Sequence, residues 1–156
     1  RYLAEGHAPD TFWQACQLFW FIFYLNGHDS PGRIDQYLFP ALKNDLERGT
    51  LTEEDAQEIT DCLYCKMAKH TAYGSTIGGR TPDGEDATNR MTWMCLSSIS
   101  RLRLLSPRTS LRVHKDTPDD LLLASAVSSS TGATFPTFVN DEVVLPAVLP
   151  VHLRPV

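Results

Sequence analysis

The stretch Ser110-Leu111-Arg112-Val113-His114 alternates polar and apolar residues, which is typical of a short β-strand. A second strand-like run follows at Phe135-Pro136-Thr137-Phe138-Val139. Between them, Thr117 can act as an N-cap with Pro118 at the first helical position, and the apolar run from Leu121 to Val127 continues as a helix. A strand, a helix and a strand in this order are typical of a crossover between parallel strands, so we predict an α/β fold.

The residues before this unit predict a helix-rich segment. The run from Thr11 to Leu25 contains no Gly or Pro, and Asp10 can cap its start. A turn over residues 32–37 leads into a second predicted helix, which contains Pro40 near its first turn and ends at Gly49.

A third helix is predicted from Thr52, which forms a capping-box pattern with Asp55. Its apolar positions, spaced as on one helical face, are Ala56, Ile59, Leu63 and Met67. We expect a loop from Tyr73 to Asp86, because this stretch holds four glycines and a proline, and we expect Asp86 to cap a further helix.

Composition limits the class of protein. The chain has 156 residues, of which 42% are apolar and 21% charged, as in an ordinary folded domain. Its 14 basic and 19 acidic residues give a net charge of -5, so we expect no nucleic-acid partner. The longest apolar run, Leu18 to Leu25, is too short to cross a bilayer, and we expect no membrane partner, a cytoplasmic location and reduced cysteines.

Two patterns resemble ligand sites. Cys62, Cys65 and His70 could supply three metal ligands, but no second pair completes a tetrahedral site, so we expect no metal and assign the cysteines to the core. The glycine-rich stretch 76–86 lacks the Lys-Ser/Thr of a phosphate-binding loop and the alternating oxygen ligands of a calcium loop, which favours a structural turn.

The densest polar cluster is residues 26–37, Asn-Gly-His-Asp-Ser-Pro-Gly-Arg-Ile-Asp-Gln-Tyr. Arg33 and Asp35 can either form a buried, satisfied ion pair or take part in binding. Asn140 and Asp141 follow the second predicted strand, at the carboxyl end where parallel α/β folds collect ligands, although they could equally cap the next helix.

Residues 26–38 resemble the pyruvate formate-lyase-like domain of glycyl radical enzymes, in its diol and glycerol dehydratase-like branch. One residue of the usual motif is absent between His28 and Gly32, and the stretch from His70 to Gly78 is short for the family. The resemblance covers about residues 11–148 and continues in order through residues 51–56, 78–79, 83–89, 111–118 and 135–146. It implies that residues 1–156 are a single partial domain, an internal piece of a ten-stranded α/β barrel.

The resemblance also implies a parent lyase that acts on a small polar molecule, whether as a dehydratase, a C–N lyase, a decarboxylase or a formate C-acetyltransferase. Its organic cofactor is a glycyl radical installed by a radical SAM activating enzyme, and a Cys thiyl attacks the substrate. Both radical sites would follow Val156, so no catalytic residue and no cofactor-binding residue is expected in this chain, which should be inactive alone. The parent is expected to be a homodimer and to work in anaerobic metabolism.

For the substrate pocket, the resemblance favours Ser30, the serine in the turn before the Gly-Arg-X-Asp-Gln segment. The other candidates for substrate binding are His28, Arg33, Asp35, Asn140 and Asp141. The alternative is a non-catalytic helical α/β module that binds a protein partner through its aromatic first helix. Such a module should leave an exposed apolar patch around Trp13 and Trp20, whereas a piece of a barrel should leave open strand edges at residues 110–114 and 135–139.

Overall fold

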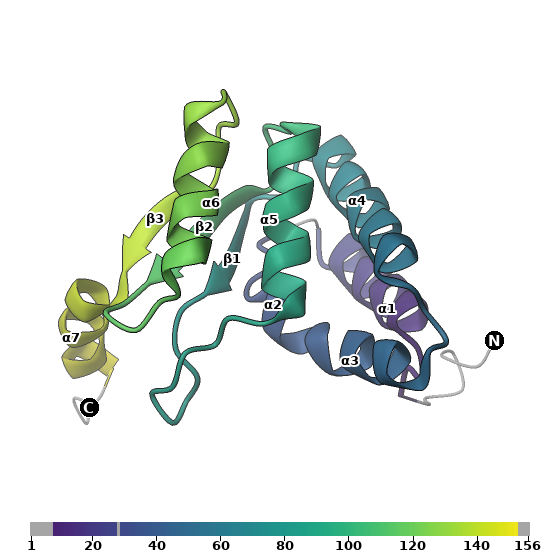
Figure 1. Ribbon diagram of the computed structural model, residues 1–156, viewed down its shortest axis with the longest axis horizontal. Helices are drawn as coiled ribbons and strands as arrows, with labels where there is room; N and C mark the ends of the chain where they lie inside the picture. The colour runs from purple at the N-terminus through teal and green to yellow at the C-terminus, as the bar shows by residue number, and fades with distance from the viewer. Residues whose placement is uncertain (1–7, 28, 153–156) are drawn as a thin grey trace.

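The computed structural model describes residues 8–27 and 29–152, and Figure 1 shows how their helices and strands are arranged. In chain order the elements are α1 (Phe12–Leu25), α2 (Ile34–Tyr37), α3 (Phe39–Arg48), α4 (Glu53–Lys69), β1 (Gly74–Gly78), α5 (Arg90–Leu102), β2 (Arg108–Val113), α6 (Asp119–Ser130), β3 (Thr137–Asn140) and α7 (Asp141–His152).

The three strands form one parallel sheet in the order β1-β2-β3. Helices α5 and α6 lie across one face of this sheet, and α1, α3 and α4 pack beyond α5 (Figure 1). The predicted α/β class is therefore confirmed, and so is the predicted unit in which α6 connects the parallel strands β2 and β3.

The prediction of a loop from Tyr73 to Asp86 was wrong at its start, where β1 runs from Gly74 to Gly78. This strand contains glycines and small polar residues, so its local propensity is weak. It is held by backbone pairing on both sides, since β2 pairs with one edge and the Thr76 N–H donates to the Gly32 carbonyl at the other. Pairing between segments far apart in the chain therefore determines this strand.

Three predicted helix caps were displaced by one to three residues. Thr11, not Asp10, caps α1 by accepting a hydrogen bond from the Gln14 N–H. Asn89, not Asp86, caps α5 in a reciprocal capping box with Thr92. The predicted cap at Thr52 is confirmed, because its hydroxyl accepts from the Asp55 N–H. The last predicted cap moved by one residue, because Pro118 rather than Thr117 is the N-cap of α6.

The apolar core lies between α1, α4, α5 and the helix-covered face of the sheet. Its largest fully buried side chains include Phe12, Leu42, Met67, Met91 and Leu111. Several apolar side chains of α1 are nevertheless exposed, among them Trp13 at 56% and Leu25 at 83%.

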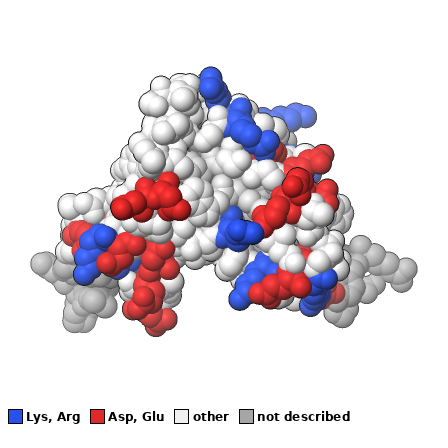
Figure 2. Space-filling view, viewed as in Figure 1, with Lys and Arg blue, Asp and Glu red and all other residues white. Residues whose placement is uncertain are grey.

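Charged side chains of both signs are mixed on the face drawn in Figure 2, and an uncharged area covers the upper part of α6. Such a distribution offers no continuous basic stripe on that face. Among the residues described, no helix combines the length and the apolar character needed to cross a bilayer.

Candidate functional site

The sheet has two chemically different faces. Successive residues of a strand point to opposite faces, so Ser75 and Ile77 of β1, which are buried, share the face covered by α5 and α6. The opposite face receives Thr76, and the parallel register places Ser110 and Thr137 beside it in one row across the three strands. The Ser110 and Thr137 hydroxyls lie 3.0 Å apart. We call Thr76, Ser110 and Thr137 the hydroxyl row.

Ser30 lies at the amino end of the same region. Its hydroxyl donates to the carbonyl of Gly74, the first residue of β1. A Cβ at Gly74 would lie 3.7 Å from the Ser30 Oγ, so Ser30 approaches the face that Gly74 and Thr76 share. Ser30 is exposed, and its hydroxyl can still accept a hydrogen bond from a ligand.

The carboxyl end of the sheet is closed by an ion pair between β2 and the start of α7. The Arg112 guanidinium donates to both carboxylate oxygens of Asp141, over 2.7 and 3.0 Å, and the Asp141 side chain is only 1% exposed. Gly79 lies directly against this pair, because a Cβ there would be 2.9 Å from the Arg112 Cβ and 3.1 Å from an Asp141 oxygen. Only glycine fits at position 79 without displacing the pair, which explains why the second residue of the Gly78-Gly79 sequence is a glycine.

Arg33 and Asp35 brace the end of β1 from the other side. Arg33 donates to the carbonyls of Gly78 and Arg80 over 2.6 and 2.8 Å. One Asp35 oxygen accepts from the Gly78 N–H and the Thr92 hydroxyl, both over 2.7 Å. Burial raises the pKa of Asp35 above its usual value, and these hydrogen bonds oppose that rise. Burial is also the main reason that the pKa of Arg33 is lowered.

A second, more exposed layer of charges surrounds these braces. Arg80 donates to Glu142 over 2.7 Å and to Asp116 over 3.3 Å, and the bond from Arg80 is the main reason that the pKa of Glu142 is lowered. The Asn140 side-chain oxygen accepts from the Glu142 N–H, so Asn140 caps the start of α7. The buried His114 ring lies 3.1 Å from both the Gly79 carbonyl and an Asp86 oxygen.

The predicted substrate-binding residues thus fall into two groups. Arg33, Asp35, Asn140 and Asp141 gather at the carboxyl end of the strands, which the sequence predicted for Asn140 and Asp141 alone. Ser30 lies at the other end of β1, about 13 Å away for four residues of extended strand. His28 lies outside the described residues, and binding by any of the six stays a prediction.

The assignment of Cys62 and Cys65 to the core was wrong, because both are exposed on α4, whereas Cys16 and Cys95 are buried. Their CxxC spacing places them one helical turn apart. Within residues 8–27 and 29–152, no three His, Cys, Asp or Glu side chains are grouped so that they could hold a metal ion.

Sequence reasoning missed the hydroxyl row. The alternation in residues 110–114 already placed Ser110 and Arg112 on one face of β2, which was the only available signal. Thr76 could not be found, because β1 was not predicted as a strand.

The class of protein to which this polar sheet face belongs follows from comparison with known families. Residues 4–152 match the pyruvate formate lyase-like family, and the chain belongs to that family. Its solved neighbours are glycyl radical enzymes, in whose barrel fold this α/β segment has its counterpart.

Among individual proteins, the chain is 33% identical to the isethionate sulfite-lyase of Desulfovibrio desulfuricans, with 90% of this chain and 20% of that protein covered. It is 30% identical to the trans-4-hydroxy-L-proline dehydratase of Clostridioides difficile, covering 92% and 21% of the two chains. The glycerol-bound structure of the B12-independent glycerol dehydratase from Clostridium butyricum is 33% identical with a TM-score of 0.84, covering 95% and 21%.

The chain therefore spans about a fifth of the length of the curated relatives that it matches. The match to isethionate sulfite-lyase extends over 165 aligned positions. It includes 90% of the 156 residues of this chain, which is about 140 residues. The remaining positions of the alignment, about 25, have no residue in this chain. The chain is thus shorter than that relative inside the matched region as well.

Proposed function

We propose that this chain forms one wall of the substrate cavity of a glycyl radical lyase that acts on a small polar molecule. The observation that carries the proposal is the polar face of the sheet, where Thr76, Ser110 and Thr137 form a row of hydroxyls. No helix among the described residues covers this row in Figure 1. In a closed barrel, the uncovered face of each strand points to the interior.

A wall of this composition suits a small molecule that carries hydroxyls or other polar groups. Each hydroxyl can both donate and accept one hydrogen bond, so the row can replace water around a polyol without burying an unpaired charge. The names of the relatives agree with this class, since they act on isethionate, on hydroxyproline and, in the solved structure, on glycerol.

The residues of the wall divide into two roles in this proposal. Ser30 and Asn140 are exposed and contact the substrate, as His28 would by the family pattern. Arg33, Asp35 and Asp141 act as positioning residues, because the hydrogen bonds of Arg33 and Asp35 hold the end of β1 and those of Asp141 join the start of α7 to β2.

The chemistry itself is supplied by the rest of the enzyme. We propose that the parent contains the thiyl Cys and the radical Gly, that a radical SAM activating enzyme installs the radical, and that the parent is a cytoplasmic homodimer. In the described residues, Cys16 and Cys95 do not fit the thiyl role. Neither lies in a Gly-Cys-X-Glu loop, which is where the family resemblance puts the thiyl Cys.

The test begins with the reading frame that surrounds this chain, extended until it includes a Gly-Cys-X-Glu loop and a C-terminal glycine-radical motif. That protein is expressed anaerobically with its activating enzyme, the radical is detected by electron paramagnetic resonance, and consumption of glycerol, 1,2-propanediol, hydroxyproline and isethionate is measured. We expect a radical and one consumed substrate. A continuous frame that forms the radical but consumes none of these compounds would refute the proposed substrate class.

Within that enzyme, Thr76→Val and Ser110→Ala should each raise KM about three- to tenfold, the value of one net hydrogen bond, with smaller effects on radical yield. Ser130→Ala, at the exposed end of α6, is the matched control and should change neither quantity. Equal KM values in all three variants would place the cavity elsewhere.

One observation favours the alternative of a protein-binding module, namely the exposed apolar side chains of α1, including Phe21 at 58%. The open edges expected of a barrel piece are present only in part. Among the described residues β3 pairs on one edge only, but the open edge predicted at residues 110–114 was wrong, because β2 pairs with β1 on one side and with β3 on the other. A reading frame that ends without radical motifs, together with a monomeric chain that melts in one cooperative transition, would support the module.

A further inference from the structure

The first residue of β2, Arg108, extends the polar sheet face toward its amino end. Successive strand residues alternate between the two faces, so Arg108 shares a face with Ser110, while the fully buried Thr109 points to the helices. The register sets Arg108 beside Gly74 of β1, which adds no side chain to this row. Arg108 is exposed and lies about 7 Å from Ser110 along the strand.

The guanidinium of Arg108 is held in place but is not neutralised. Its central carbon lies 5.8 Å from the centre of the Tyr73 ring, and such a cation–π contact leaves the N–H edges of the flat group able to donate. Within residues 8–27 and 29–152, no carboxylate forms an ion pair with Arg108. This includes Asp29, although its backbone carbonyl accepts from the Tyr73 N–H over 3.5 Å.

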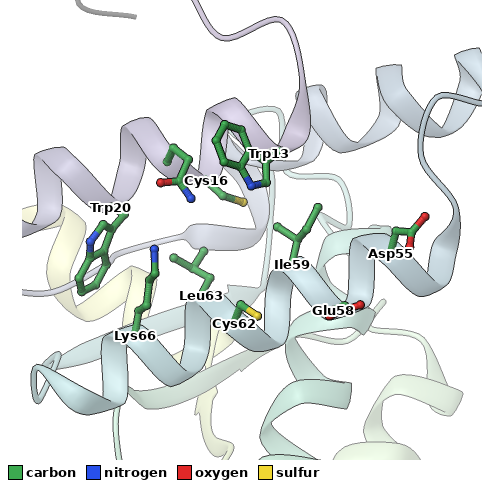
Figure 3. Close-up of a pocket in the computed structure, with 10 residues that line it drawn as sticks. Trp13, Cys16, Trp20, Asp55, Glu58, Ile59, Cys62, Leu63 and Lys66 are labelled. Atoms are coloured by element: carbon green, nitrogen blue, oxygen red, sulfur yellow. The ribbon is translucent and has the colours of Figure 1, made fainter. Parts of the chain in front are cut away.

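Comparable cations of the chain have acidic neighbours. The Lys66 ammonium also lies over an aromatic ring, but it does so in the groove between α1 and α4 shown in Figure 3, whose lining includes the carboxylate of Glu58. On the polar sheet face, Arg112 donates to both oxygens of Asp141. Arg108 lies on the same face as Arg112, and no such partner for it exists in the part of the chain that the structure describes.

A cation in this position needs a counterion once a barrel closes around it. The uncovered face of each barrel strand points to the interior, where an unpaired charge is strongly unfavourable. Either a carboxylate from elsewhere in the enzyme or an anionic substrate can supply the missing charge. The row of hydroxyls beside Arg108 favours the substrate, because one small molecule that carries an anionic group and a hydroxyl can bind to both.

We propose that Arg108 binds the anionic group of the substrate, and that the substrate is a small hydroxylated carboxylate or sulfonate. The guanidinium donates parallel hydrogen bonds to two oxygens of the anion, and both head groups offer such a pair of oxygens. The substrate hydroxyl, a short carbon chain away, then lies near Ser110. The inference rests on the proposed function, because it requires this face to line the cavity.

The test uses the complete protein of the extended reading frame in its unactivated form, so that binding is measured without the radical. The matched probes are isethionate, 3-hydroxypropionate and the neutral 3-hydroxypropanamide, each titrated calorimetrically. We expect both anions to bind about ten- to a hundredfold more tightly than the amide, the value of a charge-assisted hydrogen bond. The tighter of the two anions shows whether the head group is a sulfonate or a carboxylate.

Two substitutions of Arg108 and one control locate the site. Arg108→Gln should weaken binding of both anions about ten- to a hundredfold and leave the amide unchanged. Arg108→Lys keeps the charge but not the fork of donors, and should lose less. Arg48→Gln, at an exposed arginine of α3, removes the same charge outside the sheet face and should bind all the probes as wild type does. Both positions are exposed, so the variants should fold, which circular dichroism checks.

The possible failures are distinguishable. Equal affinity for the three probes in wild type, or an equal loss in Arg108→Gln and Arg48→Gln, would overturn the role of Arg108 but leave the proposed cavity intact. If Arg108→Gln lowers the melting temperature and keeps the affinity for the anions, a carboxylate elsewhere in the enzyme neutralises Arg108, and the inference is again wrong. Binding of none of the probes would refute the proposed function as well.

Discussion

Replacing Gly79 with alanine tests whether the carboxyl end of the sheet depends on the close approach of Arg112 and Asp141. Gly79 has a φ of +83°, and its missing Cβ would lie 2.9 Å from the Arg112 Cβ and 3.1 Å from an Asp141 oxygen. The left-handed backbone alone costs alanine roughly 1–2 kcal/mol. Displacing a buried ion pair adds to this, since complete loss of such a pair costs about 3–5 kcal/mol. We expect a total loss of about 3–5 kcal/mol.

Gly84→Ala is the matched control for this prediction. Gly84 has a φ of +88°, but nothing lies within 4 Å of its missing Cβ, so only the backbone cost of roughly 1–2 kcal/mol applies. The free energy of unfolding is measured in urea by tryptophan fluorescence, with the slope of the transition compared between variants. If Gly79→Ala destabilises the chain no more than Gly84→Ala, the steric argument for the Gly78-Gly79 sequence is wrong.

Three further substitutions test the same network. Asp141→Asn should lower the free energy of unfolding by about 2–4 kcal/mol, because it leaves Arg112 without its charged partner. The control Asp116→Asn, in an exposed pair with Arg80, should change the free energy of unfolding by less than about 1 kcal/mol. Equal losses for the two variants in urea titrations would contradict this prediction. Asp45→Ala should cost about 1–2 kcal/mol and loosen the start of α1, because a buried Asp45 oxygen accepts from the Phe12 N–H over 2.7 Å, while Asp10→Ala should be nearly silent in the same assay. Asp35→Asn tests pH dependence. Burial raises the pKa of Asp35 above its usual 3.8, so the folded state holds the proton more tightly than the unfolded chain does. The stability that Asp35 contributes is therefore greatest at low pH and is lost as the pH rises through the raised pKa. The stability of wild type minus that of Asp35→Asn should therefore fall as the pH rises above the usual pKa of 3.8. A difference that rises with pH would show that the pKa is lowered.

The parts of the fold that were predicted correctly are those with a local signal. The helix from Glu53 to Lys69 has both a capping residue and a regular apolar spacing, and β2 has a clear alternation. For Arg33 and Asp35 the sequence left open an ion pair or a role in binding, and in the described part of the chain no ion pair joins the two side chains. Both residues bind the end of β1, a strand that had not been predicted.

The missed parts depend on contacts between distant segments. β1 is composed of Gly, Ser, Thr and Ile because its neighbours approach closely on both edges, and such a composition is indistinguishable from that of a loop before the neighbours are known. Likewise, Asp45 lies 33 residues from the Phe12 N–H that it caps, so no local pattern could have revealed that Asp10 is not the residue that caps α1.

The uneven edges of the sheet indicate where further structure would join this chain. The outer edge of β1 is partly covered by residues 29–32, through the Gly32–Ser75 bridge. β3 pairs with β2 alone among the described residues, and Phe138 on this strand is 48% exposed. Leu123 on α6 and Val143 on α7 are also exposed, at 67% and 66%. An open strand edge flanked by exposed apolar side chains is unfavourable in water and is normally covered. The next strand of a barrel would cover it at β3, which is where α7 continues the chain toward the residues that the proposed radical chemistry requires.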